Sequence, residues 1–149
     1  MRCKYISNCL LTFYLTFLLL TFSFVTSSKK VPGKAGTPYE NGLYKLVIKF
    51  TEDYPSKAPD VRFEPLLWHM NIWKNGKICL NILNDNDGTW HGKWQPTTTI
   101  PEILLAVQTS LNEPNPNCPA RADIHEMYIK NRKEYDRRVV AEAKKFPAD

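Results

Sequence analysis

The chain has 149 residues, of which 43% are hydrophobic and 12% aromatic, so it is long enough and apolar enough to bury the core of one globular domain. Its formal net charge is +5, but residues 1–28 contain two basic residues and no acidic one, which leaves 18 basic against 15 acidic groups in the remainder. This mild excess excludes the strongly basic surface typical of nucleic-acid-binding proteins, so we expect no nucleic-acid partner.

Residues 1–28 differ in composition from the rest of the chain. A basic start is followed by a hydrophobic, threonine-rich run over residues 10–25 and then by small polar residues, a pattern typical of a secretory signal peptide. The run of about 16 residues is shorter than the roughly 20 that cross a bilayer. We expect residues 1–28 to lie outside the folded domain, either as a targeting or anchoring segment or as sequence from outside the true coding start. The domain itself is expected over residues 29–149.

A turn and two strands are predicted next. Gly, Pro and Lys residues over 29–42 predict a turn that leads into a strand. Residues 43–50 alternate large apolar side chains with lysines, which is the period of a half-buried antiparallel strand. Residues 61–63 form the next short strand. Together these segments predict an antiparallel meander.

Residues 68–83 join a polar triplet to a cysteine through a tight turn. The turn signal Asn75-Gly76 places Asn71 and Cys79 on the two arms of one loop. A thiolate can hold an acyl group as a thioester while an amide donates a hydrogen bond to the oxyanion, so this pair suits acyl transfer. The alternatives are a buried apolar thiol at Cys79 and a structural His69 that braces the loop backbone.

The second half of the chain predicts helices. Thr99-x-x-Glu102 is a capping box, and apolar residues then recur at helical spacing up to Leu111. A proline-punctuated linker over 112–119 follows. Residues 120–146 are predicted to be helical with a break near Lys130, and their basic face is either a surface for an acidic partner or an ordinary solvated face.

The cysteines and histidines show no metal or disulfide pattern. The four cysteines include no CxxC pair, and none combines with a histidine at a usual ligand spacing. The aspartates in the polar loop after Leu83 are not followed by the bidentate glutamate of a calcium loop. We therefore expect no metal site, no disulfide framework and a reducing compartment.

His69-x-Asn71, followed after seven residues by Cys79-Leu80-x-Ile82-Leu83, resembles the active-site signature of the ubiquitin-like-protein conjugating enzymes. Among these enzymes the SUMO-conjugating branch is the most similar, over roughly residues 29–149. Further matching segments are Pro32-Gly33-Lys34-Ala35-Gly36-Thr37-Pro38, Asp53-Tyr54-Pro55-Ser56, Phe63-Glu64-Pro65, Asn112-Glu113-Pro114-Asn115, Asn131-Arg132-x-Glu134-Tyr135 and Ala143-Lys144-Lys145-Phe146.

The resemblance implies an α+β fold in which an antiparallel meander sheet packs on a central helix and C-terminal helices follow. Members of the family begin with an amphipathic helix and a first strand, and neither is recognisable in this sequence. We therefore expect a domain of this fold without its first helix and first strand.

The resemblance also implies a transferase. Cys79 would accept SUMO from its activating enzyme as a thioester and pass it to a substrate lysine, while Asn71 would stabilise the oxyanion or brace the loop. Trp73, Cys118, Pro119 and Ala120 would desolvate the lysine ammonium and lower its pKa. His69 is a further supporting residue of the loop. No cofactor is expected in the site, because the activating enzyme consumes the ATP.

Several positions depart from the family pattern. Met70 replaces a proline, and Cys118 replaces an aspartate credited with orienting the lysine. Where the SUMO branch reads an acidic residue beyond the target lysine, this chain has Asp60, Asn75 and Lys77 together with Trp73. Asp60 would repel such a residue and Lys77 would attract it.

Other functions therefore remain open. A ubiquitin-conjugating enzyme and a catalytically inactive scaffold of the same fold are the alternatives to a SUMO transferase. SUMO ligases and substrate proteins are the further partners implied by the resemblance. It also implies the nucleus and cytoplasm, with a membrane-anchored form facing the cytosol as the alternative if residues 10–25 are expressed.

Overall fold

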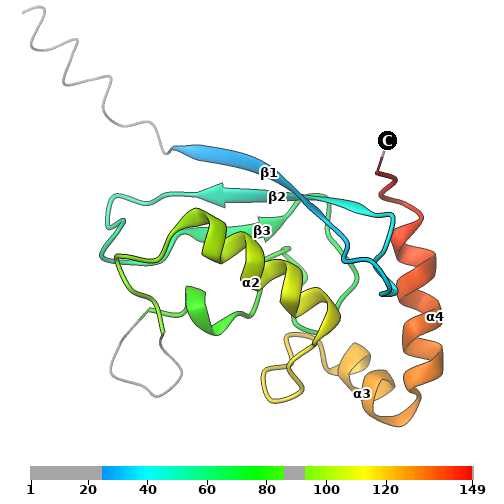
Figure 1. The fold of residues 1–149 in the computed structure, drawn as a ribbon. Helices are drawn as coiled ribbons and strands as arrows, with labels where there is room; N and C mark the ends of the chain where they lie inside the picture. Colours follow the sequence, from blue (N-terminus) through cyan, green and yellow to red (C-terminus); the bar gives the residue numbers. More distant parts are fainter. Residues whose placement is uncertain (1–24, 86–92, 149) are drawn as a thin grey trace, which may run out of the picture.

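The computed structural model describes residues 25–85 and 93–148. Three antiparallel strands form one sheet in the order β1 (Thr26–Pro32), β2 (Leu43–Lys49) and β3 (Asp60–Phe63). Helix α2 (Ile100–Asn112) crosses one face of the sheet, and helices α3 (Ala122–Lys130) and α4 (Arg132–Ala143) lie together at one end of it (Figure 1). This confirms the predicted α+β arrangement of a meander, a central helix and C-terminal helices.

Strand β2 is the centre of the sheet and shows the predicted alternation, except that Val47, on the same face as Lys45 and Lys49, is also buried. Tyr44, Leu46 and Ile48 are each no more than 1% exposed, whereas Lys45 and Lys49 are exposed. The side chains of Tyr44, Leu46 and Ile48 join residues of β3, α2 and α4 in one hydrophobic core. Burial on one face of the strand therefore fixes its register between β1 and β3.

Strand β1 corrects the expectation for the start of the domain. The sequence predicts a turn from residue 29 and places residues 26–28 outside the domain, whereas β1 pairs with β2 from Thr26 opposite Lys49 to Pro32 opposite Leu43. Most side chains of this edge strand are exposed, so no apolar alternation marks it in the sequence. The expectation that a first helix and first strand are missing concerns residues 1–24, which lie outside the described residues.

Helix α2 begins and packs as predicted. The Thr99 side chain accepts a hydrogen bond from the Glu102 N–H, and the Glu102 carboxylate accepts one from the Thr99 N–H at 2.7 Å, which completes the capping box. Ile103, Val107 and Leu111 are buried on the side facing the core. The helix therefore presents a fixed outer face beside the candidate site.

The predicted break near Lys130 is also confirmed. Asn131 ends α3 and caps α4, because its side chain accepts a hydrogen bond from the Glu134 N–H. Arg137 and Arg138 bond to the Glu134 carboxylate and lower its pKa to about 2. Because these cations are paired within the helix, the basic face has the character of a solvated surface. Within the described residues, no helix is both long and apolar enough to cross a bilayer.

Candidate active site

The loop that carries Asn71 and Cys79 is held closed by its own backbone. The Cys79 N–H donates to the Asn71 carbonyl at 2.8 Å, and Ile72 pairs with Ile78 in an antiparallel bridge. Asn71 and Cys79 therefore lie on adjacent arms of one loop, as the turn signal between them predicts.

Gly76 fixes the tip of this loop against β3. Its φ is +83°, and an added Cβ would lie 2.5 Å from the Phe63 carbonyl oxygen. The Gly76 carbonyl accepts a hydrogen bond from the Phe63 N–H at 3.0 Å, and the Asn75 side chain accepts one from the Lys77 N–H at 3.1 Å. Only glycine combines this left-handed backbone with so close an approach. Strand β3 thus determines where the cysteine arm begins.

Asn71 is 2% exposed, and its amide is fully engaged. Its Nδ2 donates to the carbonyls of Asn115 at 2.8 Å and Cys118 at 2.7 Å, and its Oδ1 accepts from the Asn115 N–H at 2.9 Å. These partners belong to the linker, which we define as residues 113–121 between α2 and α3. Since both amide hydrogens are used, Asn71 braces the linker in this arrangement and has none left for an oxyanion.

His69 is 1% exposed and supports the same arm. Its Nδ1 accepts a hydrogen bond from the Asn71 N–H at 3.0 Å. Burial lowers the pKa of His69 to about 4, although the backbone carbonyls of Leu111 and Ser110 oppose this shift. The imidazole is therefore neutral near pH 7, and its geometry fits a structural histidine that orients Asn71.

Cys79 is joined to Cys118 by a disulfide. The two residues are 39 positions apart and their Cα atoms are 6.7 Å apart. The sequence predicts no disulfide framework, and the structure corrects this expectation at one pair. The linker folds back because the Met70 carbonyl accepts hydrogen bonds from the N–H groups of residues 120 and 121, at 2.8 and 3.1 Å. No spacing rule reveals such a pair, since it depends on the path of the linker.

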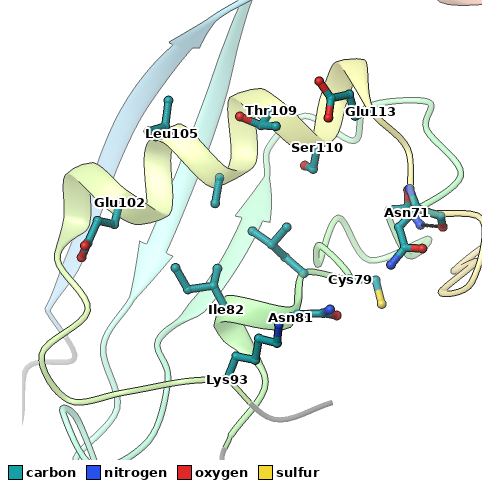
Figure 2. Close-up of a pocket in the computed structure, with 13 residues that line it drawn as sticks. Asn71, Cys79, Asn81, Ile82, Lys93, Glu102, Leu105, Thr109, Ser110 and Glu113 are labelled. Atoms are coloured by element: carbon teal, nitrogen blue, oxygen red, sulfur yellow. Dashed lines mark hydrogen bonds between the residues drawn. The ribbon is translucent and has the colours of Figure 1, made fainter. Parts of the chain in front are cut away.

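Cys79 borders a groove of about 560 Å³ between α2 and the 3-10 turn η1 (Asn81–Leu83). Figure 2 shows the groove with α2 on one side, where Leu105 and Thr109 lie, and the segment from Cys79 to Ile82 on the other. Asn71 lies at the same end of the groove as Cys79, and Glu102 lies toward the other end (Figure 2). An open groove with apolar and polar walls can hold an extended peptide whose end reaches the cysteine.

The remaining predicted supporting residues are placed differently. Trp73 is 45% exposed near the loop tip, and Pro119 is exposed on the linker. Neither of these residues lines the groove, and nor does Ala120. Of the predicted supporting residues, Cys118 is the one bonded directly to Cys79.

Two of the predicted substrate-recognition residues, Asp60 and Lys77, contact Arg62, which the sequence pattern does not mark. The Arg62 Nε donates to the Asp60 carboxylate at 2.7 Å, and Arg62 also pairs with Lys77 in an antiparallel bridge. Asp60 and Arg62 are two positions apart on β3, so they share a face of the strand. That spacing is the signal by which the pair can be found. Asn75 is exposed in the adjacent turn.

Over residues 25–85 and 93–148, no group of three potential metal ligands gathers in one place. Residues 23–143 match the sequence profile of the ubiquitin-conjugating enzyme family. The chain belongs to this family. The match contains β1, the Asn71 and Cys79 arms and the linker with Cys118, so the whole site lies within it. Ubiquitin-conjugating enzymes are transferases of ubiquitin-like modifiers, which they receive from activating enzymes.

Proposed function

We propose that this conjugating enzyme accepts SUMO from the SUMO-activating enzyme as a thioester on Cys79 and transfers it to lysines of substrate proteins. The observation that carries the proposal is the position of Cys79, beside Asn71 at one end of the groove along α2. The choice of SUMO rests on the sequence segments that resemble the SUMO branch. ATP is used by the activating enzyme, so this site itself needs no cofactor.

The reaction is two successive acyl transfers. The Cys79 thiolate attacks the carbonyl carbon of the incoming thioester, a new C–S bond forms, and the sulfur of the activating enzyme leaves as a thiolate. The neutral amine of a substrate lysine then attacks the carbonyl, the Cys79 thiolate leaves, and the amine proton passes to solvent. The acceptor is the reduced form of the enzyme, because a sulfur bonded to Cys118 cannot attack.

The groove supports binding of the modifier's extended C-terminal segment. Leu80, Ile82 and Leu105 supply apolar contacts, and Asn81 and Thr109 supply hydrogen-bonding groups on the two walls. Asn81 and Ile82 belong to η1, and Leu105 and Thr109 belong to α2, so elements of regular structure form both walls beside Cys79. The segment would place its terminal carbonyl at the sulfur.

Lysine delivery is assigned to the other side of Cys79. In this proposal Trp73 and residues 118–120 desolvate the lysine ammonium and lower its pKa. Arg62 neutralises Asp60 through their ion pair, which removes the repulsion expected from that carboxylate. Lys77 makes no ion pair among the described residues, so it remains available to attract an acidic residue of the substrate.

The same proposal places the enzyme in the nucleus and cytoplasm, with SUMO ligases and substrate proteins as its further partners. A membrane-anchored form facing the cytosol is the alternative, and it depends on residues 10–25.

A loading assay tests the proposal. The purified chain is first reduced, then incubated with ATP and either SUMO or ubiquitin with the matching activating enzyme, and products are resolved with and without thiol reductant. We expect a reductant-sensitive adduct with SUMO and none with ubiquitin.

Two substitutions at Cys79 serve as matched controls. Cys79→Ser should give an oxyester that survives reductant, because the hydroxyl forms an ester in place of the thioester, and Cys79→Ala should give no adduct. A reductant-sensitive adduct on Cys79→Ser would contradict the assignment of Cys79.

The Cys79–Cys118 bond favours one second candidate, an inactive scaffold of the same fold, because the bonded sulfur accepts no acyl group. Absence of any adduct with either modifier after full reduction would select this candidate. An adduct with ubiquitin alone would instead identify a ubiquitin-specific transferase.

A further inference from the structure

The Cys79–Cys118 pair joins the proposed nucleophile to a residue on the linker, and hydrogen bonds also connect these two segments. The Asn71 side chain makes three hydrogen bonds to the linker, and the Met70 carbonyl accepts two more. None of these five bonds involves a sulfur atom. The linker is therefore positioned by polar contacts that do not pass through the disulfide.

Both cysteines are also accessible to small reagents. Each is partly exposed, and Cys79 borders the open groove along α2. A bridge at this place occupies the one sulfur that the proposed acyl transfer needs. A permanent bridge would thus abolish the transfer, whereas a reversible bridge would control it.

We propose that Cys118 is a resolving cysteine, which captures oxidised Cys79 in a reversible disulfide and so switches off acyl loading in the presence of hydroperoxides. The effect of the bridge on loading rests on the proposed function. The formation of the bridge rests only on the geometry of the pair.

The bridge forms in two steps. In the first step the Cys79 thiolate attacks one oxygen of a hydroperoxide, so that the S–O bond forms and the O–O bond breaks. The sulfur loses two electrons to the peroxide, and water or an alcohol leaves after protonation. The Cys118 sulfur then attacks the Cys79 sulfenic acid, the S–S bond forms, and hydroxide leaves as water with the proton from Cys118. Two equivalents of a low-molecular-weight thiol reverse the bridge by exchange.

The first test asks whether the bridge can open in the folded protein. It uses the full chain with Cys3→Ser and Cys9→Ser, which leaves Cys79 and Cys118 as its cysteines. We expect a thiol reductant under native conditions to free both thiols while the circular dichroism spectrum is retained. Loss of the folded spectrum on reduction would overturn the proposal, since the bridge would then be a structural element.

The second test maps the oxidation products of the reduced chain. After hydrogen peroxide treatment and alkylation, mass spectrometry should show the Cys79 and Cys118 peptides joined by a disulfide, with two hydrogens lost. Reductant should convert this product back to two free thiols. In the matched variant Cys118→Ser, Cys79 should instead reach sulfinic acid, which thiols do not restore. Equal formation of sulfinic acid in both proteins, with no bridged peptide, would overturn the proposal.

The third test measures loading, with each protein compared with its own reduced and untreated sample. Peroxide should abolish SUMO loading both in the chain that keeps Cys118 and in its Cys118→Ser variant. Reductant should then restore loading only in the chain that keeps Cys118. Retained loading in a fully bridged sample would overturn the proposed control. If the reduced chain loads no modifier at all, the proposed function and the control of loading fail together, while the mass map still decides whether Cys118 resolves Cys79.

Discussion

At the scale of single residues, Asn71 links the two segments that meet at Cys79. It is buried, and its amide satisfies two carbonyls and one N–H of the linker. A buried amide of this kind stabilises the folded protein mainly by pairing the backbone groups around it, and less by its own burial. Removing it takes the Asn71 partner from the Cys118 carbonyl and the Asn115 N–H, while the Asn115 carbonyl still accepts a hydrogen bond from the Cys118 N–H at 3.3 Å.

We predict that Asn71→Ala lowers the free energy of unfolding by about 3 kcal/mol, because three partly buried hydrogen bonds to the linker are lost. Denaturant unfolding of the reduced protein measures this, and hydrogen exchange should rise in the linker. Asn115→Ala is the matched control: it keeps the backbone atoms that bind Asn71 and removes only an exposed hydrogen bond to the Asn117 N–H. Equal losses in both variants would show that Asn71 does not brace the linker.

At the scale of elements, the turn at residues 73–77 connects the sheet to the cysteine arm. Gly76 lies against β3, and its conformation is one that other residues rarely adopt. Gly36 also has a left-handed φ, of +75°, but no atom lies within 4 Å of where its Cβ would be. A substitution at Gly36 therefore tests backbone strain alone, whereas one at Gly76 tests backbone strain and steric contact together.

We predict that Gly36→Ala costs about 1 kcal/mol of stability, as expected for a left-handed alanine alone. Gly76→Ala should cost about 3 kcal/mol or more, because its Cβ also meets the Phe63 carbonyl oxygen at 2.5 Å and moves the loop from β3. Thermal or denaturant unfolding of the two variants measures the difference. Equal costs would mean that the turn shifts freely away from the sheet.

At the scale of the whole molecule, stability should depend on pH through His69. Its pKa falls from 6.5 in the unfolded chain to about 4 in the folded protein, so between these values the unfolded state binds more protons. The neutral imidazole therefore contributes stability above pH 6.5, and this contribution is lost as the pH falls toward 4. The shift corresponds to about 3 kcal/mol.

We predict that the free energy of unfolding falls more steeply between about pH 6.5 and about pH 4 in the natural chain than in His69→Gln. Denaturant titrations across this range give the slopes. His125→Gln, at a partly exposed position of α3, is the matched control and should keep the slope of the natural chain. An unchanged slope in His69→Gln would rule out His69 as the source of the pH dependence.

The structural features that the sequence predicts correctly are local ones. The alternation in β2, the capping box before α2 and the glycine turn that sets Asn71 beside Cys79 each depend on residues within a few positions of one another. Periodicity and turn chemistry express such contacts directly in the order of residues. Family membership then follows from the loop motif, which the profile match over residues 23–143 supports.

Other features depend on long-range contacts and became visible only in the tertiary structure. Strand β1 exists because β2 offers it hydrogen-bonding partners, although its own side chains carry no apolar pattern. Cys118 reaches Cys79 because Asn71 and Met70 fold the linker back over 39 positions of sequence. The sequence thus determined the pairing of an amide with a thiol, and the fold decided which second thiol meets that cysteine, because the path of the linker depends on distant hydrogen bonds.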